Sequence, residues 1–449
     1  MGRLFGTDGA RGVANSELTC ILAMNIGKAA AMVLTTEDDR HPLFLIGKDT
    51  RLSSDMLEGA LIAGLTSIGA NVMSIGVVPT PAVAYLVRKY KASAGIMISA
   101  SHNSYEFNGI KIFSSDGYKL PDELEEEIEG IVLDNVIPYP TVVDNGIGRV
   151  ERNEKAVNDY IDHIIDSVSY RLDGLKVALD CSNGSSSLTA EKLFSALGAK
   201  CHMLYNNPDG LNINRDCGST HMENLIEFVK NNDMDAGLAF DGDADRCLAV
   251  DENGNIIDGD FIMAILSEDM KQRGKLKKDT VVGTVMTNMG FNKFCDENGI
   301  KFVSTKVGDR YVLEDMLREG YNLGGEQSGH IIFLDYGTTG DGQLTGAQLL
   351  SLLNRRKEKL SHLSKLMKKY PQVLVNVRVS AEGKLKYYTD HEIRDEIENV
   401  KALLEGRGRV LVRVSGTEPL VRVMLEGEDI DEITAHANYL ADIVKKRLS

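Results

Sequence analysis

The chain has 449 residues, 43% of them apolar, and a formal net charge of −16 at pH 7. This length accommodates about three domains with a small fourth one, and the negative charge disfavours a nucleic-acid partner. No segment offers the roughly 20 consecutive apolar residues of a transmembrane helix, and the N-terminal residues lack the pattern of a signal peptide. We therefore expect a globular protein without a membrane or nucleic-acid partner.

The six cysteines are scattered along the chain, and none of them forms a C-x-x-C pair. This spacing argues for reduced, mostly buried thiols rather than a disulfide or zinc framework. We therefore expect a cytoplasmic location. Because the chain as a whole is acidic, an anionic substrate must be bound by a local cluster of basic groups.

One local pattern occurs three times. Residues 42–51 are typical of a strand that runs into a polar loop, 53–70 of a helix, and 71–78 of a second strand. The same succession recurs at 174–205 and at 279–308. Repeated strand–loop–helix–strand units predict three related α/β domains with mixed, largely parallel sheets.

The last part of the chain has a different pattern. Residues 372–380 alternate in polarity, 391–406 are typical of a helix, and 409–425 form two strands around a turn. This order predicts a small C-terminal α+β domain. The expected domains are residues 1–150, 151–254, 255–369 and 370–449.

A Ser-His pair follows the apolar run 94–98, "AGIMI", which is typical of a buried strand. Ser101 and His102 then lie at the carboxyl end of that strand, where ligands bind in open α/β sheets. Ser101 could be a nucleophile, a phosphate ligand or only a turn residue. We expect no simple Ser-His dyad, because neighbours on an extended chain point to opposite faces.

The segment "DGDADR" places Asp241, Asp243 and Asp245 at alternate positions. Three carboxylates this close repel one another unless a divalent cation holds them. An EF-hand is excluded, because Arg246 occupies the position that requires glycine. A magnesium site fits better, and the alternative is an acidic turn without a metal.

The segment "RVSGTEP" resembles a phosphate cradle. Arg413 ends a strand, and Ser415, Gly416 and Thr417 offer hydroxyl and backbone N–H donors in a tight turn. Arg422 lies on the returning strand. The alternative is an ordinary hairpin.

Residues 322–330, "NLGGEQSGH", combine donors and acceptors that suit sugar hydroxyls. The segment is not a hydrolase nucleophile elbow, because Glu326 replaces the first glycine. Nearby, Lys306 is a further candidate, whereas Asp309 is explained as a helix N-cap. Arg11 lies in the glycine-rich segment "FGTDGARG", where it is either functional or a solvated charge.

Ser101 in "SASHN", then "DGDADR", "GGEQSGH" and "RVSGTEP", occur in this order and at these separations in the α-D-phosphohexomutase superfamily. The chain resembles that superfamily over essentially its whole length. Within it, "GGEQSGH", "KVGDRYV" and "TTGDGQLTGAQLL" are most similar to the bacterial members that act on glucosamine phosphates. The resemblance implies interconversion of glucosamine 6-phosphate and glucosamine 1-phosphate, which supplies UDP-N-acetylglucosamine synthesis.

The resemblance also implies the roles of individual residues. Ser101 would be carried as a phosphoserine, a hexosamine bisphosphate would be the intermediate, and Mg²⁺ would be bound by Asp241, Asp243, Asp245 and an oxygen of phosphorylated Ser101. Lys111 or His102 would be the general base, and the sequence leaves this choice open. The further site residues would be Arg11, Lys111 and Arg246 around the transferring phosphoryl group, Glu326, Ser328, His330 and Lys306 at the sugar, and Arg413, Ser415, Gly416, Thr417 and Arg422 at the second phosphate.

Other functions remain open at this point. A mutase for mannose or glucose phosphates would use the same machinery. A metal-dependent phosphatase would use an aspartate nucleophile and leave Ser101 without a role. A non-catalytic sugar-phosphate-binding protein would not need both the serine and the acidic triad. We also allow for a homodimer.

Overall fold

The structure is a computed structural model that describes residues 3–6, 8–35, 40–415 and 419–448. It divides into two compact units, which comprise residues 1–286 with 299–366, and residues 287–298 with 367–449. Among the described residues, no helix combines the length and the hydropathy of a membrane span.

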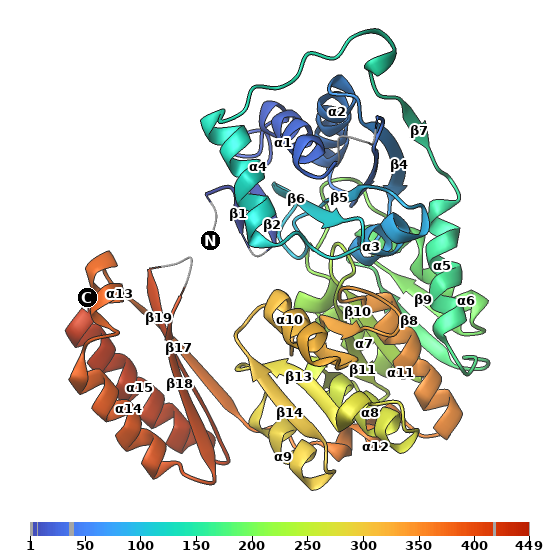
Figure 1. Cartoon of the computed structure of the whole chain (residues 1–449). Coiled ribbons are helices and arrows are strands. Elements are labelled where there is room, and N and C mark those ends of the chain that lie inside the picture. The colour runs from blue at the N-terminus through green and yellow to red at the C-terminus, as the bar shows by residue number, and fades with distance from the viewer. Residues whose placement is uncertain (1–2, 7, 36–39, 416–418, 449) are drawn as a thin grey trace. The chain divides into compact units, whose positions relative to one another are not determined.

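The first domain of the larger unit is built on a seven-stranded mixed sheet of order β1-β2-β6-β5-β3-β4-β7 (Figure 1). Strands β3, β4, β5 and β7 run parallel, whereas β1, β2 and β6 form antiparallel pairs. The elements are β1 (Phe5–Gly6), β2 (Gly9–Val13), α1 (Cys20–Val33), β3 (Leu43–Lys48), α2 (Leu52–Ser67), β4 (Asn71–Val77), α3 (Thr80–Lys89), β5 (Ala94–Ile98), β6 (Phe107–Ser114), α4 (Asp122–Asp134) and β7 (Val150–Arg152).

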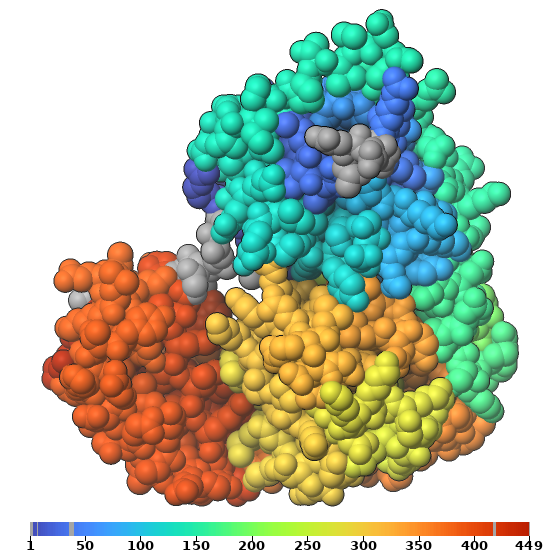
Figure 2. All heavy atoms as spheres, viewed as in Figure 1, coloured from blue at the N-terminus to red at the C-terminus, as the bar shows by residue number. Residues whose placement is uncertain are grey.

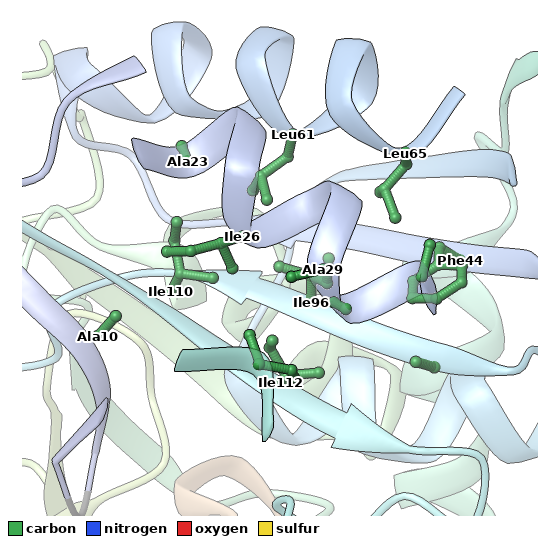
Figure 3. Packing of buried hydrophobic residues seen from close by; sticks show 14 of the residues in the cluster. Ala10, Ala23, Ile26, Ala29, Phe44, Leu61, Leu65, Ile96, Ile110 and Ile112 are labelled. Atoms are coloured by element: carbon green, nitrogen blue, oxygen red, sulfur yellow. The ribbon is translucent and has the colours of Figure 1, made fainter. Parts of the chain in front are cut away.

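The core of this domain lies between the sheet and the helices α1 and α2 (Figure 3). These two helices approach closely, since a Cβ atom on Gly64 would lie 2.2 Å from the carbonyl oxygen of Met24. The buried strands read as nearly continuous apolar runs, as expected for parallel strands covered on both faces. The helices contribute Ala23, Ile26, Ala29, Leu61 and Leu65 to this core, and the strands contribute Ala10, Phe44, Ile96, Ile110 and Ile112.

The second domain contains a five-stranded sheet of order β12-β11-β10-β8-β9. Strand β8 is parallel to both β9 and β10, and β10 forms an antiparallel hairpin with β11. The segment "DGDADR" forms the whole connection of this hairpin, because Phe240 pairs with Cys247. The elements are α5 (Ala156–Ser167), β8 (Lys176–Asp180), α6 (Ala190–Ala196), β9 (Lys200–Leu204), α7 (Glu223–Asn231), β10 (Ala236–Phe240), β11 (Cys247–Asp251) and β12 (Ile256–Ile257).

The third domain contains a four-stranded sheet of order β14-β13-β15-β16. Strand β13 is parallel to β14 and β15, and β15 is antiparallel to β16. Side chains of the first domain, cyan to teal in Figure 2, lie against this domain, in part through a hydrogen bond from Thr338 Oγ1 to the Gly117 carbonyl. The elements are α8 (Gly259–Gln272), β13 (Thr280–Thr284), β14 (Lys301–Thr305), α10 (Asp309–Glu319), β15 (Leu323–Gly325), β16 (Ile331–Phe333), α11 (Gly342–Arg356) and α12 (Leu360–Leu363).

The smaller unit contains a three-stranded antiparallel sheet of order β17-β19-β18. Its core joins β17, β18 and β19 to α14 and α15. The elements are α9 (Met289–Glu297), β17 (Gln372–Arg378), α13 (Ala381–Lys386), α14 (His391–Leu403), β18 (Gly408–Val414), β19 (Leu420–Gly427) and α15 (Ile430–Leu448).

The predicted fold class is confirmed. The three repeated units are β3-α2-β4, β8-α6-β9 and β13-α9-β14, and in each of them the two strands are neighbours and parallel. The C-terminal segment forms the small α+β arrangement that its alternating pattern predicted. All six cysteines are free thiols, and four of them are buried.

Candidate active site

Ser101 lies in the loop that follows β5, at the carboxyl end of the parallel strands of the first sheet. Its side chain is buried, and its Oγ donates a hydrogen bond of 2.6 Å to Oδ2 of Asp241. Asp241 begins the acidic loop of the second domain. The fold therefore brings the serine and the acidic loop together, as a nucleophile or phosphate carrier beside a cation site would require.

His102 lies close to Ser101, and the expectation that the two side chains diverge was wrong. Nδ1 of His102 is 3.3 Å from Oγ of Ser101. The expectation assumed an extended chain, but Ser101 has a left-handed backbone with φ of 50°. Burial, together with the charges of Arg246 and Arg11, lowers the pKa of His102 to about 4, so the ring is neutral near pH 7.

The three aspartates converge as predicted. Oxygen atoms of Asp241, Asp243 and Asp245 all lie within 4.8 Å of one another, and the side chains are buried. One oxygen of Asp243 and one of Asp245 are buried without a hydrogen-bond partner among the described residues. Buried carboxylate oxygens that lack protein donors are suited to a hard divalent cation such as Mg²⁺. The residues present therefore fit a magnesium site.

The ionisation of the triad reflects mutual repulsion. Burial, followed by the charges of Asp245 and Asp243, raises the pKa of Asp241 well above its usual range. Burial acts in the same direction on Asp245, but Lys111 and His330 outweigh it and hold the pKa of that carboxyl well below its usual range. In the absence of a bound cation, burial and repulsion thus favour the protonated form of Asp241, whereas Lys111 and His330 favour the ionised form of Asp245.

Lys111 is the cation in closest contact with the triad. Its Nζ, on β6, lies 2.5 Å from Oδ2 of Asp243 and 3.8 Å from Oδ2 of Asp245. Burial opposes its charge, but the two aspartates outweigh burial and raise its pKa. In this arrangement Lys111 is protonated and donates hydrogen bonds.

Two arginines lie near enough to His102 for their charges to lower its pKa. The backbone N–H of Arg246 donates to Oδ1 of Asp241, and its Nη1 lies 3.3 Å from Nδ1 of His102. Arg11 lies on β2, with Nη2 3.6 Å from a carboxylate oxygen of Asp8. The Nε atoms of both arginines are buried without a hydrogen-bond partner among the described residues, although Nε of Arg246 lies 4.0 Å from Oδ1 of Asp245. Such donors suit the oxygens of a phosphoryl group on the neighbouring serine.

The segment "GGEQSGH" is the turn between β15 and β16. Oε1 of Glu326 accepts a hydrogen bond of 3.1 Å from the backbone of Gly308, and burial raises the pKa of this carboxyl. The hydroxyl oxygen of Ser328 is buried and has no partner within the described part of the chain. The turn therefore has polar atoms available for a ligand.

His330 connects this turn to the triad. Its Nδ1 lies 3.5 Å from Oδ2 of Asp245, and the backbone N–H of Gly340 donates to its Nε2. In the neutral ring the proton is therefore assigned to Nδ1, which faces Asp245. Lys306, by contrast, is exposed, and its ammonium group lies 5.5 Å from the centre of the Tyr311 ring.

The predicted phosphate cradle belongs to the smaller unit. Arg413 on β18 and Arg422 on β19 are directly opposite each other in the antiparallel ladder. Burial and the charge of Arg422 lower the pKa of Arg413. Ser415 is buried, and its backbone N–H donates to the carbonyl of Leu420. Gly416 and Thr417 lie outside the described residues.

Comparison with known proteins assigns the whole chain. Four sequence profiles of phosphoglucomutase/phosphomannomutase match it in order. They are the alpha/beta/alpha domain I at residues 2–136, domain II at 158–254, domain III at 258–370 and the C-terminal domain at 374–443. The chain belongs to the phosphoglucomutase/phosphomannomutase family.

Curated members of this family align with the full length of the chain. A phosphoglucosamine mutase of Clostridium acetobutylicum is 55% identical over 447 residues, and one of Clostridium botulinum (strain Loch Maree / Type A3) is 54% identical over 449 residues. Each alignment covers 100% of both proteins.

Solved structures of family members have the same fold. A phosphoglucomutase/phosphomannomutase family protein of Burkholderia thailandensis is 25% identical, with a TM-score of 0.85 over 99% of this chain and 98% of that one. An N-acetylphosphoglucosamine mutase of Aspergillus fumigatus, solved with GlcNAc-6P and magnesium, is 16% identical, with a TM-score of 0.71 over 99% of this chain and 96% of that one.

Several residues at the site of this family member were not found from the sequence. Lys119 forms a 2.6 Å ion pair with Asp309, which also lies 3.5 Å from His330. Asp309 was explained as an N-cap, but Gly308 occupies that position and the carboxylate faces the site. Thr80 donates a 2.6 Å hydrogen bond to Asp243 from the first turn of α3. No motif marks Lys119 or Thr80, because each of them acts through a contact with another domain.

Proposed function

We propose that the chain is a phosphoglucosamine mutase that interconverts glucosamine 6-phosphate and glucosamine 1-phosphate through a phosphoserine at position 101. The observation that carries this proposal is the buried hydroxyl of Ser101, 2.6 Å from an aspartate of the acidic triad. Full-length identity of 55% to a curated phosphoglucosamine mutase supports the choice of substrate.

The reaction is a phosphoryl relay. The bond between phosphorus and Oγ of Ser101 breaks while a bond forms to the free hydroxyl oxygen of the sugar monophosphate, which gives a hexosamine bisphosphate. The proton of that hydroxyl passes to a base, and Oγ of Ser101 takes up a proton as its bond to phosphorus breaks. Of the two candidate bases, His102 fits better than Lys111, because its ring is neutral near pH 7 whereas Lys111 is protonated. After the bisphosphate has turned in the site, its other phosphoryl group passes to Oγ of Ser101, which loses its proton, and the sugar oxygen that is released takes up a proton. No free phosphate is released.

The residues around Ser101 have two different roles, contact with the phosphoryl group and binding of a cation. Arg11, Arg246 and Lys111 donate to the oxygens of the transferring group, and charge-assisted donors in a buried site stabilise the charge that it develops. The triad would hold magnesium together with an oxygen of the phosphoserine, and the bound cation would offset the phosphoryl charge.

Substrate recognition would come from the two remaining segments. Glu326, Ser328, His330 and Lys306 would bind the sugar, and the Arg413 loop with Arg422 would bind the phosphate that does not react. Ser328 supports this role, because its buried hydroxyl oxygen has no partner within the described part of the chain.

The test combines intact mass with turnover. A fraction of the purified protein should be heavier by one phosphate, and Ser101→Ala should lose that fraction together with turnover while still binding glucosamine 6-phosphate. An alanine variant that keeps more than a few per cent of wild-type kcat would contradict the relay. A phosphatase would instead release inorganic phosphate from either substrate.

A further inference from the structure

The backbone of the Ser101 loop needs external support. Ser101 is not a glycine, yet it has the left-handed conformation with φ of 50°. For a residue with a side chain this conformation is strained, and it persists only where the surroundings hold it. The conformation also places Oγ at both Asp241 and His102, so whatever holds the backbone sets the direction of the hydroxyl.

Two side chains hold the carbonyl groups of this loop. Nη2 of Arg51 donates to the carbonyl oxygens of Ser101 and Asn103, each at 2.9 Å. Nδ2 of Asn214 donates to the same two oxygens, at 2.8 and 2.9 Å. A carbonyl oxygen has two lone pairs, so each of these carbonyls accepts its full complement from the same two donors. Arg51 also donates to the carbonyl of Ser104.

Arg51 is itself fixed. Its side chain has no exposed surface, and its Nε donates a 2.8 Å hydrogen bond to Oδ2 of Asp49, which is equally buried. The same oxygen accepts a bond from Ser99, whose hydroxyl in turn accepts from the backbone N–H of Ser101. The guanidinium group therefore cannot leave the loop without unpairing a buried carboxylate, which is costly.

Asn214 is the second side chain that holds the loop, and it belongs to the second domain. It follows β9, its backbone is left-handed with φ of 58°, and its N–H donates to the carbonyl of Ser182. Gly242 lies directly behind it, since a Cβ atom there would be 2.5 Å from the Ser101 carbonyl and 2.9 Å from Nδ2 of Asn214. Arg51 thus belongs to the first domain, which carries Ser101, and Asn214 belongs to the second domain, which carries the acidic loop. We call these two side chains the clamp.

We propose that Arg51 and Asn214 are positioning residues that hold Ser101 at the acidic triad while its phosphoryl group leaves and returns. This inference rests on the function proposed above. A relay needs the same oxygen in place for two transfers, and a displacement of about 1 Å can reduce a rate about 100-fold. Neither residue needs to touch the sugar, so the clamp should act on kcat rather than on KM.

The sharpest variant is Asn214→Gly. Glycine adopts φ above zero without strain, so this change removes the amide donor and leaves the backbone conformation accessible. Asn135→Gly is the matched control, because Asn135 is an exposed left-handed asparagine, with φ of 52°, at the end of α4. We expect kcat to fall about 10-fold or more in Asn214→Gly, with KM for glucosamine 6-phosphate changed less than about threefold, and no kinetic change in the control.

Arg51→Lys tests the contribution of Arg51 to the clamp. Lysine keeps the charge but lacks the planar fork that reaches Asp49 and three carbonyls at once. Arg3→Lys is its control, because Arg3 forms an exposed ion pair with Asp134 in the same domain. Single-turnover transfer from phosphorylated enzyme to glucosamine 6-phosphate should slow in Arg51→Lys and stay unchanged in Arg3→Lys. If Arg51→Lys does not fold, Asn214→Gly still tests the proposed positioning role.

Two results would overturn the clamp. One is a lower melting temperature of Asn214→Gly with unchanged single-turnover transfer, and the other is a loss confined to KM. Failure of the proposed function has a different signature, because the wild-type chain would then carry no phosphoserine and interconvert no glucosamine phosphate. In that case the positioning role proposed for Arg51 and Asn214 would be contradicted as well.

Discussion

The ammonium group of Lys111 lies 2.5 Å from the carboxylate of Asp243, and both side chains are almost completely buried. The lysine thus serves as a counterion for two of the three aspartates, Asp243 and Asp245. Removal of one partner of a buried pair leaves an uncompensated charge, which costs about 3–5 kcal/mol.

Lys111→Met should lower the free energy of unfolding in the presence of a chelator by about 3–5 kcal/mol, and Mg²⁺ should restore part of the loss because a cation can replace the lysine charge. Denaturant unfolding with and without Mg²⁺ measures this. Lys277→Met, which removes one partner of the exposed 2.7 Å pair with Asp335, serves as control and should show neither effect. A loss of stability in Lys111→Met that Mg²⁺ does not change would contradict the prediction.

Chelation of divalent cations should stop turnover, and added Mg²⁺ should restore it. Asp243→Asn keeps the size of the side chain but removes ligand charge, so activity or metal affinity should fall about 10-fold or more. The measurement is the rate as a function of Mg²⁺ concentration, with the exposed Asp233→Asn as control in the same domain. Full activity in chelator would mean that the acidic loop is only a turn.

Arg413→Ala should weaken the binding of sugar phosphates. A charge-assisted hydrogen bond is worth roughly 1.5–3 kcal/mol, which corresponds to about 10- to 150-fold in affinity. Because both orientations of the bisphosphate need this loop, kcat should fall as well. Arg407→Ala, which removes an exposed 2.6 Å pair with Glu432 in the same unit, is the control. Unchanged kinetics with a lower melting temperature would favour a plain hairpin.

Glucosamine phosphates should be the preferred substrates, with glucose phosphates converted slowly. Glu326 and Ser328 can both accept hydrogen bonds from the amine at C2, and Glu326 can offset its charge. The measurement compares kcat/KM for glucosamine, glucose and mannose phosphates under one condition. Glu326→Gln should reduce the differences in kcat/KM among these three substrates. A hexose phosphate that equals or exceeds glucosamine phosphate would assign the chain to the hexose mutases instead.

The sequence was sufficient for features that are local. The apolar run before Ser101, the alternating aspartates and the turn "GGEQSGH" each lie within a few residues, and all three occur where the pattern placed them. The repeated strand–loop–helix–strand units were recognisable for the same reason. The homodimer, the cytoplasmic location and the roles of individual site residues stay predictions.

Long-range contacts explain what was missed or wrong. Asn214 and Ser101 are separated by 113 residues, and Lys119 and Asp309 by 190, so no spacing rule connects them. The prediction for His102 failed because the backbone of Ser101 is left-handed, and the side chains that contact this backbone, Arg51 and Asn214, are distant in the sequence. No local sequence pattern predicts a serine with a left-handed backbone.

The opposed arginines of the smaller unit, Arg413 and Arg422, also bear on how the protein should be handled. Like charges at directly opposite positions of an antiparallel ladder repel each other. Any small dianion that enters between them relieves this repulsion, so the pair should bind inorganic phosphate or sulfate as well as a sugar phosphate. Phosphate-buffered or sulfate-rich solutions would then act as competitors and raise the apparent KM in proportion to anion concentration. Kinetic work is better begun in a buffer of bulky, singly charged ions.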